Sequence, residues 1–159
     1  MTKFTLAVAA ALALSIPAAG HAAPETPTAP AAGVLRVKSA YGVDETVARL
    51  KADIAAKGIK FFIEIDQGQL GAGANLNIRP SRLILFGNPP LGVQFLQSNP
   101  YAGLDWPVRM LIIEEADGSV SVAWNDFAVI AKRYAIRDRD AQFKMAGEVA
   151  ASIASSATN

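Results

Sequence analysis

The chain has 159 residues, of which 52% are hydrophobic, and its 15 basic residues almost balance its 14 acidic ones. This length fits one domain with an apolar core. A net charge of +1 argues against a nucleic-acid-binding protein, because phosphate recognition needs clustered basic residues. The absence of cysteine excludes disulfides, thiol redox chemistry and cysteine-bound zinc.

Residues 1–22 have the three parts of a secretory signal peptide. Lys3 supplies a positive charge, residues 4–16 are apolar, and small residues precede an expected cut after Ala22. The alternative is a retained membrane anchor, but an apolar run of roughly 13 residues is short of the about 20 that span a bilayer. We therefore expect a periplasmic or secreted protein that does not remain in the membrane after cleavage.

Cleavage would also remove the single histidine, His21. Loss of Lys3 would leave 14 of the 15 basic residues against 14 acidic ones, a net charge near zero. A mature chain without imidazole or thiol cannot form Ser-His-Asp or Cys-His sites. An enzyme would have to use carboxylates, Lys, Tyr or a bound cofactor, and we predict neither a metal nor a cofactor.

The first half of the domain follows a Pro- and Ala-rich flexible linker over residues 23–33. Alternating polarity predicts a strand over 34–39. A one-sided apolar pattern then predicts a helix with Asp44 as its N-cap and Gly58 as its C-terminal glycine. A second strand is predicted over 59–66, with Phe61, Ile63 and Ile65 on one face. The glycine-rich segment 67–80 fits either a long loop or a short irregular helix.

The stretch over 83–90 is the most informative local pattern. Four apolar residues over 83–86 predict a strand buried on both faces, and Gly87, Asn88 and two prolines then end it abruptly. Such a corner places one carboxamide at the edge of the core, where a pocket could form. It is equally an ordinary turn in which Asn88 hydrogen-bonds its own backbone.

The rest of the chain alternates short strands and helices. We predict a helix from Leu91 that ends before Asn99, strands over 108–115 and 120–124 joined at Asp117-Gly118, a short helix capped by Asn125-Asp126, and a last helix over 138–155. The order over 34–156 predicts one α+β domain. Its sheet would be curved and mostly antiparallel, with about five strands and with helices on one face.

Several short motifs follow one another along the chain between residues 34 and 145. They are Tyr41 with Thr46-Val47-x-x-Leu50, Ile65-Asp66, Arg79-Pro80, Phe86-Gly87-Asn88-Pro89, Asp105-x-Pro107, Glu115-x-Asp117-Gly118 and Trp124-Asn125-Asp126. This set resembles the domain of unknown function 302 family (DUF302). The resemblance implies a fold similar to the TATA-binding protein in β-α-β(4)-α order, frequent pairing as a homodimer, and no established reaction. Relatives commonly have His where this chain has Gln67, so no metal or acid–base role is carried over to Asp66.

The candidate ligand-binding residues come from the strand-ending corner and from nearby charges. They are Asp66, Phe86, Gly87, Asn88, Pro89, Asp105 and Arg109. Asp66 and Asp105 are the one acid–base pair that we consider, although each also suits a capping role. Arg79, Arg82 and Arg109 could bind an anion together, or could pair singly with Glu64 or Glu114. Most of the Phe and Trp residues are expected in the core, and a minority could line a cavity.

Three functions remain open from the sequence. The first is a non-catalytic exported module that forms a homodimer and holds a small apolar or weakly anionic ligand near Asn88 and Asp66. Such a module would not bind nucleic acid and would not insert into the membrane after signal cleavage. The second is a hydrolase or isomerase that uses Asp66 and Asp105. The third is a structural protein that acts through an exposed apolar surface in a dimer.

Overall fold

A computed structural model describes residues 32–158. The predicted signal peptide over 1–22 and the predicted linker up to residue 31 lie outside the described residues. The elements in chain order are β1 (Val34–Lys38), α1 (Val43–Ala56), β2 (Lys60–Asp66), α2 (Gln67–Gly73), β3 (Ser81–Gly87), α3 (Pro89–Ser98), the 3₁₀ helix η1 (Pro100–Leu104), β4 (Val108–Glu114), β5 (Val120–Asn125), α4 (Phe127–Arg133) and α5 (Asp140–Ser155).

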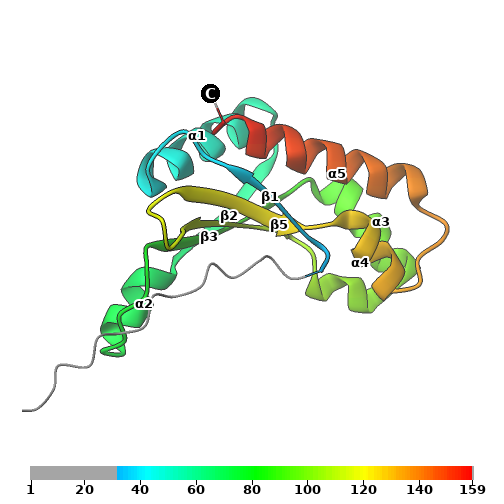
Figure 1. The fold of residues 1–159 in the computed structure, drawn as a ribbon. Coiled ribbons are helices and arrows are strands. Elements are labelled where there is room, and N and C mark those ends of the chain that lie inside the picture. Colours follow the sequence, from blue (N-terminus) through cyan, green and yellow to red (C-terminus); the bar gives the residue numbers. More distant parts are fainter. Residues whose placement is uncertain (1–31, 159) are drawn as a thin grey trace, which may run out of the picture.

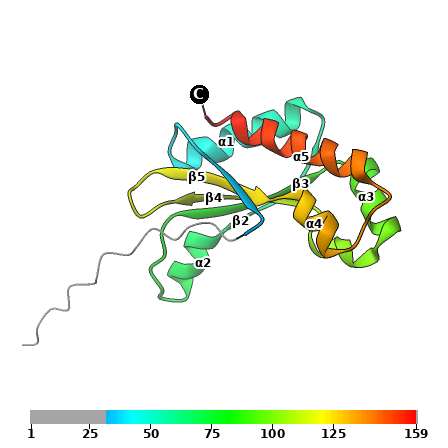
Figure 2. The same cartoon turned by 45° about the vertical axis from the view of Figure 1, so that its right-hand side comes forward.

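The five strands form one sheet in the order β1-β5-β4-β3-β2, and each neighbouring pair is antiparallel. Helix α1 thus carries the chain from one edge of the sheet to the other. Figures 1 and 2 show α1 and α5 side by side over one face, whereas α2 projects on the opposite side. The predicted α+β class with its antiparallel five-stranded sheet is confirmed. The face opposite α1 and α5 is called the open face below.

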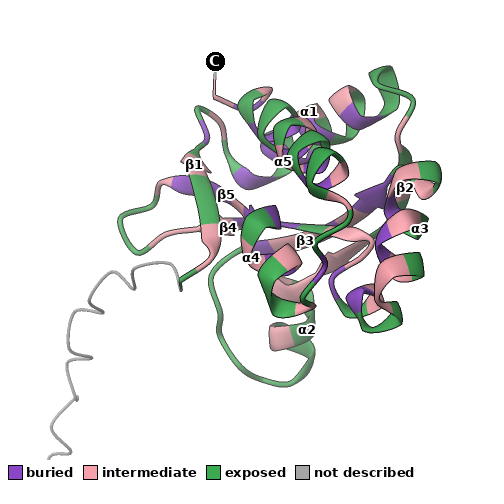
Figure 3. Cartoon of the chain, turned by 90° about the vertical axis from the view of Figure 1, so that its right-hand side faces the viewer, coloured by how far each residue is buried: buried purple, intermediate pink, exposed green. Residues whose placement is uncertain are grey.

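The core lies between the sheet and the helices α1 and α5. Ile84 of β3, Leu50 of α1 and Ile153 of α5 have no exposed surface, and Figure 3 shows the buried positions gathered in this layer. The prediction that residues 83–86 are buried on both faces is wrong. Leu83 and Leu85 are only partly buried, because they point to the open face, which α1 and α5 do not cover.

A bulge in β2 overturns the predicted facing of that strand. Phe61 pairs with Phe86 on the helix-covered face, but the register shifts between Phe61 and Ile63. One extra residue at this point moves every following side chain to the other face. Ile63 and Ile65 therefore lie on the open face, and Glu64 faces α1, where its carboxylate lies 3.1 Å from Nζ of Lys51.

The predicted helix ends are capped by the kinds of residue that we expected, although not always at the expected position. Gly42, not Asp44, is the N-cap of α1, and Gly58 has the left-handed φ of +64° expected after a helix. The segment 67–80 is resolved as the short helix α2 followed by irregular chain. Asp126 caps α4 as predicted, by accepting a hydrogen bond of 2.8 Å from the amide of Ala128.

Candidate functional site

The corner after β3 leaves the side chain of Asn88 free of any capping role. Asn88 is the N-cap of α3, and an N-cap side chain normally accepts from the amide of the second or third helical residue. Here the second residue, Pro90, has no N–H. The amide of the third, Leu91, donates instead to the carbonyl oxygen of Asn88 at 3.1 Å. The turn alternative, in which the carboxamide caps its own backbone, is therefore not what the structure forms.

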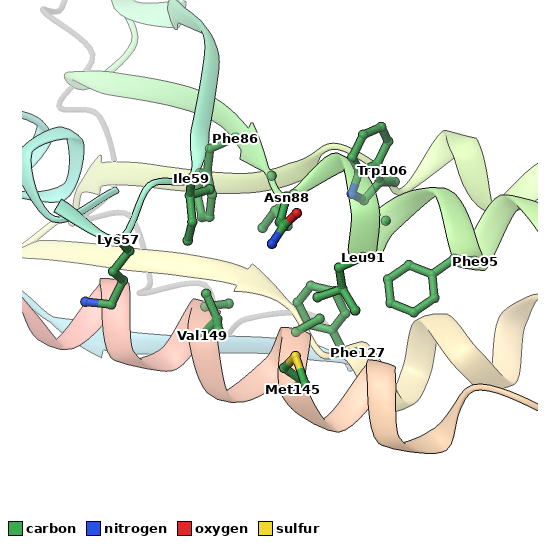
Figure 4. Close-up of a pocket in the computed structure, with 15 residues that line it drawn as sticks. Lys57, Ile59, Phe86, Asn88, Leu91, Phe95, Trp106, Phe127, Met145 and Val149 are labelled. Atoms are coloured by element: carbon green, nitrogen blue, oxygen red, sulfur yellow. The ribbon is translucent and has the colours of Figure 1, made fainter. Parts of the chain in front are cut away.

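A cavity of about 310 Å³ opens beside this corner, between α3, α5 and the end of β3. Figure 4 shows the Asn88 carboxamide among the side chains that border it. The deep wall is apolar and includes Phe86 and Ala150, each 1% exposed, and Phe95. The lining residues are Lys57, Ile59, Phe86, Gly87, Asn88, Leu91, Gly92, Phe95, Trp106, Val108, Phe127, Met145, Ala146, Val149 and Ala150.

The polar side chains of Lys57 and Asn88 lie at the mouth of the cavity. Both are exposed lining residues, as is the apolar Met145. Nζ of Lys57 lies 2.6 Å from both carboxylate oxygens of Asp53, so the ammonium already has a partner. Of the described residues that line the cavity, Lys57 alone has a titratable side chain. The cavity therefore combines an apolar interior with a mouth of low net charge.

Trp106 forms one wall, and two glycines make room for it. A β-carbon on Gly92 would overlap the indole ring, and one on Gly87 would lie 3.3 Å from Nε1. Phe62, the residue at the β2 bulge, meets the indole edge-to-face with ring centroids 6.1 Å apart. The bulge, the strand end and the helix thus hold this wall together.

Asp105 anchors the chain just before Trp106. Its side chain is 4% exposed and accepts hydrogen bonds from Nη1 of Arg133 at 2.6 Å, the Tyr134 hydroxyl at 2.7 Å and Nδ2 of Asn125 at 3.3 Å. The hydrogen bond to Asp105 raises the pKa of Tyr134 above its ordinary 10.0 and also raises the pKa of Arg133. These bonds join the start of β4 to the end of β5 and the C-terminus of α4.

Asp66 lies at the other end of the sheet from Asp105. Asp66 pairs in register with Arg82 at the start of β3, whereas Phe86 at the end of β3 pairs with Val108, just after Asp105. Arg82 and Phe86 are four steps apart along the strand, which is roughly 13 Å at about 3.3 Å per step. The predicted pairing of Asp66 with Asp105 as acid and base is therefore wrong.

Asp66 has the capping role that was its alternative, whereas the side chain of Asp105 caps no helix and instead accepts from side chains of α4, β5 and the residue after α4. Oδ1 of Asp66 accepts from the amide of Gln69 at 2.8 Å, which caps α2, and lies 2.7 Å from Nη1 of Arg82. The prediction that Arg79, Arg82 and Arg109 bind an anion together is also wrong. Arg82 faces α1 among carboxylates, including Glu64 at 3.5 Å, whereas Arg109 lies opposite Leu85 on the open face.

The predicted site residues thus divide into two groups. Phe86, Gly87 and Asn88 line the cavity, and Pro89 begins the helix beside it. Asp66, Asp105 and Arg109 do not line it. Sequence reasoning did not single out Lys57, Met145 and the α5 residues as lining. Gly92 was the available signal, because a glycine inside a helix costs about 1 kcal/mol relative to alanine and often marks a close approach.

Comparison with curated proteins gives partial matches. The chain is 36% identical over 104 residues to the fluoride-specific ion channel FluC 1 of Brucella suis and to FluC 1 of Brucella abortus. These matches cover 65% of this chain but 41% and 38% of those proteins, so the chain spans about two fifths of their length. Among residues 32–158, no helix combines the length and the apolar character needed to cross a membrane.

Comparison with solved structures and family models agrees on one family. The crystal structure of an uncharacterized conserved protein DUF302 from Bacillus stearothermophilus matches with a TM-score of 0.73 and 15% identity, over 80% of this chain and 99% of that one. At this identity the likeness establishes the fold. The model of the domain of unknown function DUF302 matches residues 35–156. The chain therefore belongs to the DUF302 family.

Proposed function

We propose that this protein is an exported, non-catalytic binding module that holds a small, mainly apolar ligand in the cavity between α3 and α5. The observation that carries the proposal is an apolar cavity of about 310 Å³ with an uncommitted carboxamide at its mouth. Small-molecule sites in proteins are mostly apolar, have about 300–1,000 Å³ and contain a few polar groups that orient the ligand. Burial of apolar ligand surface would supply the affinity, at roughly 25 cal/mol per Å² before the costs of association.

The chemistry of the lining favours binding over turnover. General acid–base catalysis needs at least one titratable group free to exchange a proton with the substrate. Lys57 is the one titratable group among the described lining residues, and its ammonium is held by Asp53. The separation of Asp66 from Asp105 also removes the carboxylate pair on which the enzyme alternative depended.

A pocket-filling variant tests the proposal. Ala146→Leu places three more carbons into the cavity from α5, whereas Ala151→Leu adds the same group to an exposed position of the same helix. Trp106 lines the cavity, so its fluorescence reports occupancy by the neutral apolar probe N-phenyl-1-naphthylamine. We expect the probe to quench the wild type and Ala151→Leu but to bind Ala146→Leu at least ~10-fold more weakly. Equal binding to all three proteins, or no binding to the wild type, would contradict the proposal.

Export is a separate part of the proposal. Mass spectrometry of the protein recovered from a periplasmic fraction should give a chain that begins at Ala23. A cytoplasmic chain that retains Lys3 would contradict export and leave the cavity unaffected.

A second candidate function, self-association, is favoured by the open face of the sheet. Six large apolar side chains, namely Ile63, Ile65, Leu83, Leu85, Leu111 and Ile113, lie on it, and none is fully buried. The arm formed by α2 and residues 74–80 adds Leu70, Leu76 and Ile78, which are 65%, 64% and 47% exposed. Large apolar side chains that gather on one exposed face commonly mark an interaction site.

A second copy of the chain is the occupant that we propose for this face. A two-fold dimer needs only one self-complementary patch, and two sheets pack face to face about 10 Å apart. Leu83→Lys would put a charge at the centre of the interface, and Leu104→Lys is a matched control at an exposed site outside it. Analytical ultracentrifugation should give a dimer for the wild type and the control and a monomer for Leu83→Lys. A monomeric wild type at micromolar concentration would rule out the dimer.

A further inference from the structure

The mouth of the cavity has one side chain able to choose between ligands by their polar group. Asn88 is exposed there, and its carboxamide has both an acceptor oxygen and two donor hydrogens. We propose, as an inference that rests on the proposed function, that the ligand is an uncharged apolar molecule. It would have one neutral hydrogen-bonding group, such as a hydroxyl or a ketone, that pairs with Asn88. A carboxylate at the same position would be disfavoured.

The N-terminus of α3 borders the cavity but has fewer free N–H groups for an anion than most helix starts. A helix start usually presents several free N–H groups to a negative ligand. In α3 the first two positions are Pro89 and Pro90, which have no N–H. The next two amides, of Leu91 and Gly92, both donate to the carbonyl oxygen of Asn88, at 3.1 and 2.9 Å. Of the N–H groups that a helix start leaves free, those of Pro89 and Pro90 are therefore absent and that of Leu91 is occupied.

The one cation in the lining is neutralised. Nζ of Lys57 is 2.6 Å from Oδ1 and from Oδ2 of Asp53, one helical turn earlier. A ligand carboxylate that approached Lys57 would lie close to Asp53, whose negative charge already balances the ammonium. Asp53 thus disfavours an anionic ligand at the mouth, because like charges at close range repel.

The other lining side chain with a polar atom is Trp106, and its indole is uncharged. Its Nε1 lies toward Gly87 and Gly92, so it is packed against the wall of the cavity. Behind it the wall consists of Phe86, Phe95 and Ala150. A charged group would lose water on entering this space without gaining a counter-ion, whereas a hydroxyl would exchange water for one hydrogen bond to Asn88.

Ligands of matched length test the inference. Displacement of N-phenyl-1-naphthylamine, followed by the emission of the probe itself, is measured with 1-octanol, 2-octanone and octanoate at pH 8, where a carboxylic acid is ionised. We expect the alcohol and the ketone to bind at least ~10-fold more tightly than octanoate. Asn88→Leu should weaken octanol binding about 2- to 10-fold, the range of one hydrogen bond, and Asn77→Leu, an exposed control, should not change it.

The outcomes separate this inference from the proposed function. Octanoate binding as tightly as octanol, with that affinity lost in Lys57→Met, would overturn the inference and keep the cavity as a binding site. Octanol binding that is unchanged in Asn88→Leu would likewise remove Asn88 from recognition. Failure of all three ligands to bind, together with failure of N-phenyl-1-naphthylamine, would overturn the proposed function itself.

Discussion

The indole of Trp106 lies directly against the backbone of Gly92, so closely that a β-carbon at position 92 would occupy the space of the ring. This relationship joins the segment before β4 to the first turns of α3. It also sets the width of the cavity, because both residues line it.

Gly92→Ala should therefore lower stability although alanine is the better helix former. Overpacking against a rigid ring costs about 1–3 kcal/mol, and the gain in helix propensity is about 1 kcal/mol at most. We expect the free energy of unfolding in urea to fall by up to about 2 kcal/mol, together with weaker quenching of Trp106 by the neutral probe. Gly147→Ala in α5 is the control. Its β-carbon would lie 3.8 Å from Phe127, an ordinary contact, so it should be neutral or stabilising. Equal effects of the two variants would refute the close-approach argument.

Asp105→Asn should destabilise the fold without removing any lining residue. The buried carboxylate accepts from Arg133, Tyr134 and Asn125, and replacing it leaves the guanidinium without its charged partner. The side chain of Arg133 is 52% exposed, so the pair is only partly buried. We therefore expect the free energy of unfolding to fall by about 2–3 kcal/mol, less than the 3–5 kcal/mol of a fully buried pair. The emission of Trp106 should shift as well. Asp138→Asn, at a carboxylate that is 58% exposed, should change stability by less than about 0.5 kcal/mol.

Tyr134 predicts a specific dependence on alkaline pH. Its hydrogen bond to Asp105 raises its pKa above 10.0 in the folded protein. The unfolded phenol therefore loses its proton first, so this stabilisation is complete below pH 10 and is lost as the pH rises through the folded pKa. Tyr134→Phe should be less stable than the wild type at pH 8, and the difference should shrink above pH 10. Tyr101→Phe, at a side chain that is 74% exposed, should show no such difference in chemical denaturation at any pH.

Asp66→Ala tests the separation of the two carboxylates. It removes the cap of α2 and the contact with Arg82, so amide exchange in residues 67–73 should accelerate, with a local cost of about 1 kcal/mol. Probe binding in the cavity should stay within twofold of the wild type, because Asp66 lies at the opposite end of β3. A tenfold loss of binding would place Asp66 in the site after all. Asp44→Ala, which removes a more distant contact of Arg82 at 3.3 Å, is the control.

The family, the order of most elements and the strand-ending corner at residues 86–89 could all be read from the amino-acid sequence. These depend on local chemistry. Proline has no N–H, glycine tolerates a close approach or a left-handed turn, and apolar residues repeat with the period of a strand or a helix. Hence Phe86, Gly87 and Asn88 could be chosen as pocket candidates without coordinates. The sequence also explains why Asn88 does not cap α3, since Pro90, two residues later, has no N–H to donate.

Which residues meet in space became visible only in the folded chain. One bulge at Phe62 reversed the facing of Ile63 and Ile65, and a single inserted residue leaves almost no trace in an alternating pattern. The antiparallel register put Asp66 and Asp105 at opposite ends of β3, although both read as strand-end carboxylates. The cavity wall from α5 comes from residues about sixty positions after Asn88. Such contacts depend on how elements pack in space, and spacing along the chain does not encode that distance.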